Sequence, residues 1–126
     1  MAKFFYRMQN ILNIKYKLEE QAKQEFSQAQ NRYIQEQEKL ELLKLRKNNC
    51  MQEMRELANE KLNVIELERC NQSLSIFDEM ISAQKEVVFR AMAEMDQART
   101  KLNEIMQERK THEKLKEHQF EAFYKN

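Results

Sequence analysis

The second half of the chain carries two rows of mainly apolar residues, and each row repeats every seven positions. One row contains Leu67, Leu74, Ile81, Val88, Met95 and Leu102, and the other contains Cys70, Phe77, Gln84, Ala91, Ala98 and Ile105. Alternating steps of three and four residues bring both rows onto one face of a helix. Such a seam is typical of a helix that packs along another helix, so it predicts a long helix over about residues 64–123.

The first half of the chain follows a different spacing, in which apolar residues recur every eleven positions. Leu18, Ala29, Leu40, Met51 and Leu62 form one such row, and Ile11, Ala22 and Tyr33 form a second. Eleven residues over three turns correspond to a straight or slightly right-handed path. We therefore expect a helix over about residues 4–59 that supercoils only gently with its partner.

The chain is expected to reverse near its midpoint, because one helix of about 120 residues would reach about 180 Å. Asn63 with Glu66 resembles a helix N-terminal capping box. This signal places the turn at about residues 60–63, so the numbers of facing residues should add up to about 124. Large side chains then face small ones, as for Phe26 with Ala98. The predicted fold is all-α, a single coiled-coil domain formed by a long antiparallel two-helix hairpin over residues 1–126.

Composition supports long helices and argues against an enzyme. The 126 residues include no Gly, no Pro and no Trp, whereas 41% are hydrophobic, 34% are charged and the mean hydropathy is −0.91. Gly and Pro supply the tight turns from which phosphate-binding and active-site loops are built. His112 and Glu113 begin like a helical zinc motif, but Lys116 stands where the second His is required. We expect no catalytic residues, no cofactor, no metal and no small-molecule substrate.

Membrane and export signals are also missing from the sequence. No apolar run approaches the roughly 20 residues that span a bilayer, and no secretory signal follows Met1. Cys50 and Cys70 are too few for a disulfide framework and are expected to be packing residues in a reducing cytosol. The sequence therefore predicts a cytoplasmic protein with at most peripheral membrane association.

Charge is distributed unevenly, although the net charge is only +1. Residues 1–18 carry four basic and no acidic side chains, and residues 109–126 carry five basic and three acidic ones. An antiparallel hairpin brings these segments together, so one tip should hold a net charge of +6 that suits an acidic partner surface. A membrane-surface helix over residues 4–17 is an alternative. Nucleic acid is not an expected partner, because acidic residues dominate 19–108.

The tip also departs from a regular coiled coil. Arg109, His112, Lys116 and Gln119 replace apolar residues on the extrapolated seam. Apolar and aromatic residues gather at both chain ends instead, namely Phe4, Phe5, Tyr6, Met8, Leu115, Phe120, Phe123 and Tyr124. We expect this tip to be frayed or splayed alone and to be ordered by a partner, for which clustered aromatic residues are suitable anchors.

Short motifs stand at both ends of the chain. The opening reads Phe4-x-Tyr6-Arg7-Met8-Gln9-x-x-Leu12 and continues to Leu18-Glu19-Glu20-Gln21-Ala22. The closing motif reads Arg109-Lys110-x-x-Glu113-Lys114-Leu115-Lys116-Glu117. Together, at this separation, the motifs resemble the FliJ family of flagellar export proteins, and the resemblance covers the whole chain.

The resemblance implies a non-catalytic coupling protein and chaperone of the flagellar type III export apparatus, similar to the central stalk of rotary ATPases. The implied partners are the hexameric export ATPase FliI, the export gate protein FlhA and export chaperones. The implied location is the cytoplasmic face of the inner membrane. The residues carried over to the ATPase pore are Phe4, Tyr6, Arg7, Met8, Arg109, Lys110, Lys114, Leu115 and Lys116. For the export gate protein, the resemblance suggests only Leu74, Phe77 and Ile81 as binding residues. These three also lie on the predicted seam.

Two functions of other classes remain open. A holdase-type chaperone would bind clients through apolar residues that lie off the seam and are expected to be partly exposed, namely Leu42, Leu45, Ile76, Phe89 and Met92. A structural coiled-coil spacer unrelated to the flagellum would oligomerise through its outer faces. Rising ionic strength weakens charge-driven docking more than apolar client capture, so salt distinguishes the first alternative.

Overall fold

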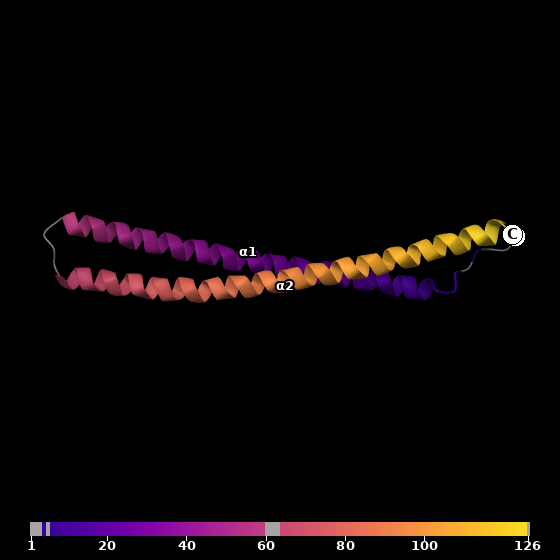
Figure 1. Cartoon of the computed structure of the whole chain (residues 1–126), viewed down its shortest axis with the longest axis horizontal. Coiled ribbons are helices and arrows are strands. Elements are labelled where there is room, and N and C mark those ends of the chain that lie inside the picture. Colours follow the sequence, from indigo (N-terminus) through magenta and orange to yellow (C-terminus); the bar gives the residue numbers. More distant parts are fainter. Residues whose placement is uncertain (1–3, 5, 60–63, 126) are drawn as a thin grey trace. The chain divides into compact units, whose positions relative to one another are not determined.

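A computed structural model describes residues 4, 6–59 and 64–125, and within these residues it contains two helices and no strand. Helix α1 spans Gln9–Asn59 and helix α2 spans Val64–Lys125 (Figure 1). The two long helices pack against each other in opposite directions, because residues early in α1 contact residues late in α2. The predicted all-α helical hairpin is confirmed.

The helix ends differ from the prediction at the N-terminus. Helix α1 begins at Gln9 rather than near residue 4, and residues 7–8 form a turn ahead of it. The Gln9 amide donates to the Tyr6 carbonyl at 3.0 Å, which closes this turn. Helix α2 continues to Lys125, two residues past the predicted end. The predicted turn at residues 60–63, with its capping residue Asn63, lies outside the described residues.

The chain is divided into two compact units, and a segment of α1 packs against a segment of α2 in each. Unit 1 comprises Met1–Ala29 and Glu94–Asn126, and unit 2 comprises Gln30–Ala93. The buried core of unit 2 consists of Leu40, Ile81, Val88 and Ala91, with Tyr33 and Leu43 packed against the first three. The buried core of unit 1 consists of Tyr6, Leu12, Ala22 and Met95, together with the charged residue Glu19.

The seam of α2 follows the predicted seven-residue spacing. All twelve residues of the two rows, from Leu67 to Ile105, are buried or half-buried. The cross-helix pairs also agree with the predicted register. Lys15 with Glu108, Glu25 with Lys101 and Lys47 with Asp78 each have residue numbers that add up to within two of 124. The facing segments in each unit are therefore aligned as the sequence predicts.

The seam of α1 also repeats every seven residues, so the predicted eleven-residue spacing is wrong. Its two buried or half-buried rows are Leu12, Glu19, Phe26, Tyr33, Leu40, Lys47 and Met54, and Lys15, Ala22, Ala29, Glu36, Leu43, Cys50 and Leu57. Ile11 and Leu18, which the eleven-residue spacing placed on the seam, are exposed. The eleven-residue spacing indicated the wrong face of α1 because four positions of the true seam hold charged residues. A pattern based on hydrophobicity assigns charged residues to the surface.

Each charged seam residue of α1 has a polar partner on α2. In unit 2, the Gln84 side-chain amide donates to a Glu36 carboxylate oxygen at 2.7 Å and to the Glu36 carbonyl at 2.9 Å. Lys47 pairs with Asp78 in the same unit. In unit 1, the Lys15 ammonium lies 2.8 Å from Glu108. Such pairs favour one register of the helices, because a shift would leave half-buried charges without partners.

Candidate functional site at the paired terminal segments

An aromatic cluster joins the beginning of the chain to the last turns of α2. The Phe4 ring lies 5.1 Å from the Phe120 ring and 5.6 Å from the Phe123 ring, measured between centroids. Tyr124 contacts both of these α2 rings, at 4.6 Å and 5.0 Å. Edge-to-face and tilted contacts of this kind stabilise a pair by about 0.5–1.5 kcal/mol beyond the burial of area. The three α2 rings remain exposed, so this aromatic cluster is available to a partner.

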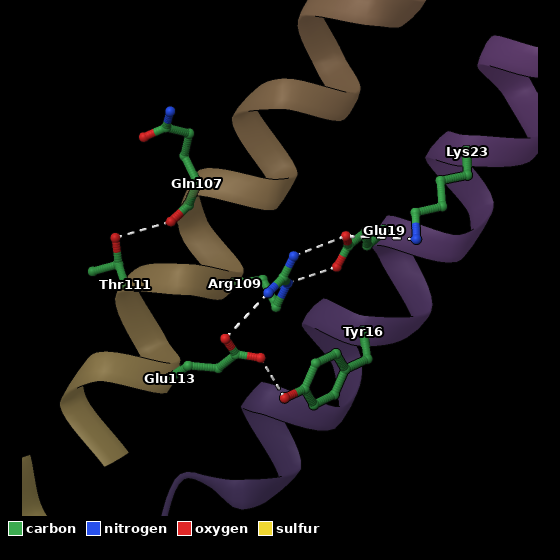
Figure 2. A network of polar contacts seen from close by, with 7 residues as sticks. All are labelled: Tyr16, Glu19, Lys23, Gln107, Arg109, Thr111 and Glu113. Atoms are coloured by element: carbon green, nitrogen blue, oxygen red, sulfur yellow. Dashed lines mark hydrogen bonds and ion pairs between the residues drawn. The ribbon is translucent and has the colours of Figure 1, made fainter. Parts of the chain in front are cut away.

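A network of polar contacts connects the two helices further along unit 1 (Figure 2). The Arg109 guanidinium of α2 donates two hydrogen bonds to the Glu19 carboxylate of α1, at 2.8 Å and 3.1 Å. It donates a third, at 3.1 Å, to Glu113 on the next turn of α2. The Tyr16 hydroxyl of α1 donates to the other Glu113 oxygen at 2.6 Å. Glu19 is only 6% exposed, so its carboxylate is largely removed from water. The bidentate pairing with Arg109 offsets the free-energy cost of that burial.

The network changes the proton affinity of its members. The hydrogen bond from Tyr16 holds the pKa of the Glu113 carboxyl below its usual value, and Arg109 adds to this effect. The same bond raises the pKa of the Tyr16 phenol. The hydrogen bond to Glu19 raises the pKa of the Arg109 guanidinium. At neutral pH, Glu113 is therefore ionised, Tyr16 keeps its proton and Arg109 is charged, which is the state that the contacts require.

Three of the nine residues expected at the ATPase-binding tip lie between the helices. Arg109 is held by Glu19, and the Lys116 ammonium donates to the Gln9 side-chain oxygen at 2.6 Å. Tyr6 is 3% exposed, and the Lys116 ammonium lies 6.0 Å from the centre of its ring. The expectation of a frayed or splayed tip is therefore wrong for α2, because Arg109 and Lys116 have partners across the seam and α2 is helical through Lys125.

The other six tip residues lie nearer to solvent. Arg7, Lys110, Lys114 and Leu115 are exposed, and Phe4 and Met8 are half-buried. Among the described residues, no ion pair engages Arg7, Lys110, Lys114 or the neighbouring Lys17. These four side chains are therefore free to bind a partner's carboxylates, whereas Lys15 and Arg109 are held in ion pairs across the seam. We call Arg7, Lys17, Lys110 and Lys114 the basic set.

A groove of about 310 Å³ lies beside the aromatic cluster. Its lining consists of Phe4, Leu12, Tyr16, Glu113, Lys116, Glu117 and Phe120. The walls are mostly apolar, which suits an apolar side chain of a partner. Over the described part of the chain, no three His, Cys, Asp or Glu residues come together in a way that could hold a metal ion.

The residues expected at the gate-binding surface are in unit 2. Ile81 is buried in the core with Leu40 and Val88, and Leu74 and Phe77 are half-buried on the seam. Packing between the helices occupies these side chains, so they do not form an open surface. The five off-seam residues expected to be partly exposed are exposed, and Phe89 is the most open of them. Cys50 and Cys70 are half-buried free thiols on the seam.

Sequence reasoning missed the polar members of the network, Tyr16, Glu19 and Glu113. A signal was present for Glu19, because it stands seven residues after Leu12 and seven before Phe26, on the true seam. The unusual Arg109 on the facing seam of α2 supplied the matching charge. Reading α1 with the seven-residue spacing of α2 would have placed Glu19 and Arg109 near one another.

No helix in the described part of the chain has the length and hydrophobicity to cross a membrane. No curated protein and no solved structure matches the sequence. The sequence model described as "Flagellar FliJ protein", in contrast, matches residues 4–126. This match covers nearly the whole chain and includes both helices and both terminal motifs. The chain belongs to the FliJ family and is a component of the flagellar export apparatus.

Proposed function

We propose that the chain is a non-catalytic coupling protein that docks on the hexameric export ATPase FliI through the end of unit 1 that carries both terminal segments. It binds the ring with this end and also contacts the export gate protein FlhA and export chaperones. Its place is the cytoplasmic face of the inner membrane. The protein hydrolyses nothing in this account, and it influences the ring only by binding some of its states better than others.

The observation that carries the proposal is that unit 1 holds both the basic set and the aromatic cluster. Helix α2 contributes Lys110 and Lys114 to the set, helix α1 contributes Lys17, and Arg7 lies in the turn ahead of α1. None of the four has an ion pair among the described residues. Uncancelled positive charge speeds and orients binding to an acidic surface. Exposed aromatic rings add the apolar anchors on which stable protein interfaces depend.

The buried contacts of unit 1 support the same function in a different way. The pairing of Arg109 with Glu19, and of Lys116 with Gln9, holds the two terminal segments together before any partner binds. A surface that is already ordered loses little conformational entropy on binding. These residues are therefore proposed to position the docking end, and the exposed residues are proposed to contact the ATPase.

Reversing three exposed charges tests this function directly. We expect the triple substitution Arg7→Glu, Lys110→Glu and Lys114→Glu to weaken binding to purified FliI by roughly 100-fold or more, because attraction to an acidic surface becomes repulsion. Isothermal titration calorimetry at low salt measures the affinity. Wild-type binding should also weaken as salt is added.

The matched control reverses three exposed basic residues of unit 2, with Arg46→Glu, Arg55→Glu and Arg90→Glu. This control changes the net charge equally and should bind FliI within about threefold of the wild type if position matters. Circular dichroism should show the same helicity for all three proteins. Equal loss of binding in the control, or full binding by the first variant, contradicts docking through the basic set.

A further inference from the structure

Helix α1 exposes a second apolar row in unit 1, apart from its seam. Ile11 is 39% exposed, Ile14 is 54% exposed and Leu18 is 40% exposed. Ile11 and Leu18 are seven residues apart and Ile14 lies between them, so all three share one face of the helix. None of the three belongs to the buried rows through which α1 contacts α2.

The register of the hairpin extends this row onto α2. The Lys101 ammonium lies 3.0 Å from the Glu25 carboxylate, so these two residues stand on the same flank of the seam. Ile11 lies two seven-residue repeats before Glu25, and Leu115 lies two repeats after Lys101. The same flank therefore presents Ile11 and Leu115 at one level, and Leu115 is 43% exposed. We call Ile11, Ile14, Leu18 and Leu115 the apolar strip.

Positive charge borders the apolar strip on both helices. Lys17 precedes Leu18 and Lys114 precedes Leu115, and both lysines are exposed members of the basic set. One carboxylate on this flank, Glu108, lies one repeat before Leu115 and is bound by Lys15 at 2.8 Å. That contact lowers the pKa of Glu108 and cancels its charge. The strip is therefore an apolar centre bordered by two exposed lysines that form no ion pair within the described residues.

We infer that the apolar strip is a docking surface for a protein whose matching surface is apolar in the middle and carries carboxylates at its edges. The inference rests on the proposed function, because the strip lies in the same unit as the basic set. It adds a second contact surface, on the flank of Glu25 and Lys101, to the docking end of unit 1. Burial of isoleucine and leucine supplies the affinity, and the lysines set the orientation. A lipid surface is a poorer match for the strip. An amphipathic helix that binds a membrane inserts one continuous apolar face into the lipid, whereas the side chains of the strip are partly covered and are divided between two packed helices.

The test replaces two residues of the apolar strip in the full-length chain. We expect Ile14→Ser with Leu18→Ser to weaken binding to purified FliI by roughly tenfold or more. The matched control, Ile34→Ser with Leu45→Ser, changes similarly exposed residues of α1 in unit 2 and should bind within about twofold of the wild type. Lys17→Glu is a surface substitution that breaks no ion pair among the described residues, and it should also weaken binding. This variant tests the inference even if the serine variant does not fold normally.

Each other outcome overturns the inference. If the strip variants bind FliI like the wild type while charge reversal of the basic set abolishes binding, the proposed function stands and the apolar strip is not the contact. If the wild type does not bind FliI, the proposed function fails and the inference falls with it. Strip-dependent binding to phosphatidylglycerol vesicles identifies a lipid partner instead. Strip-dependent self-association in sedimentation equilibrium identifies a second copy of the chain as the occupant.

Discussion

Replacing Arg109 with alanine is expected to lower the thermal unfolding midpoint of the chain by roughly 5–10 °C. The substitution removes both hydrogen bonds to Glu19, whose carboxylate is almost completely covered by the packed helices. Lys23, whose ammonium lies 3.8 Å from Glu19, would still be paired with this carboxylate, but a long single contact does not replace the two hydrogen bonds from Arg109. Losing the main partner of a buried carboxylate costs more than a surface ion pair contributes. Circular dichroism at 222 nm, a wavelength that reports helix, measures the midpoint during heating.

A second readout identifies the cause of this loss. Arg109 helps to hold the pKa of Glu113 below its usual value, so we expect that pKa to rise when Arg109 is replaced. A pH titration followed by nuclear magnetic resonance of the Glu113 carboxyl carbon measures it. Lys44→Ala is the matched control, because Lys44 forms an ion pair with Glu41 on the surface of α1 and its loss should change the midpoint by about 1 °C or less. An unchanged midpoint in Arg109→Ala would show that Glu19 is not held in the way described.

Replacing Leu40 with alanine is expected to destabilise the fold by about 3 kcal/mol, within the usual range for a buried leucine. Leu40 is 5% exposed and contacts Ile81 and Val88 in the core of unit 2. Two helices offer few other side chains that could move into the space, so the cavity should stay largely open. Urea unfolding, followed by the loss of helicity, measures the change in free energy.

Leu42→Ala provides the comparison for Leu40→Ala on the same turn of α1. Leu42 lies off the seam and is about half exposed, so its loss should cost less than about 1 kcal/mol. Equal effects of the two substitutions would mean that Leu40 is not in the core and that the seven-residue seam of α1 is misplaced.

The hairpin could be predicted from the sequence because the seam of α2 is almost entirely apolar. Six apolar residues in one row, from Leu67 to Leu102, define a face that no other arrangement buries as well. The register of the two helices then followed from the position of the turn alone. Cross-helix contacts such as Lys47 with Asp78 bear out that alignment within unit 2.

The seam of α1 could not be predicted in the same way, because its charged members do not differ from surface residues in a hydrophobicity pattern. Lys15 and Glu36 are seam residues only because α2 supplies Glu108 and Gln84 at the matching levels. Their burial depends on tertiary pairing, which a single-helix pattern does not contain. Ile11 and Leu18 were misplaced for the converse reason, since they are apolar and yet lie on an outer face.

At the expected docking end, too, one part of the arrangement could be predicted from the sequence and another part could not. Composition was sufficient to locate basic and aromatic residues at the two chain ends, and the structure brings those ends together in unit 1 through contacts such as Phe4 with Phe120. Composition could not separate the residues that hold the end together from those that face solvent. Arg109 and Lys110 are adjacent in the sequence, yet Glu19 binds Arg109, whereas Lys110 is exposed and has no ion pair in the described part of the chain.

The distance between the two terminal segments shows whether the helices pair in opposite directions in unit 1. Spin labels at Lys17→Cys and Lys110→Cys, with Cys50 and Cys70 replaced by serine and labelled molecules diluted in unlabelled ones, report that distance within one chain. Antiparallel pairing in unit 1 predicts a separation of roughly 20 Å, set by neighbouring helices and the arms of the labels. A single extended helix would place the labels on the order of 140 Å apart. A missing short distance would contradict both the paired terminal segments and the docking surface built on them.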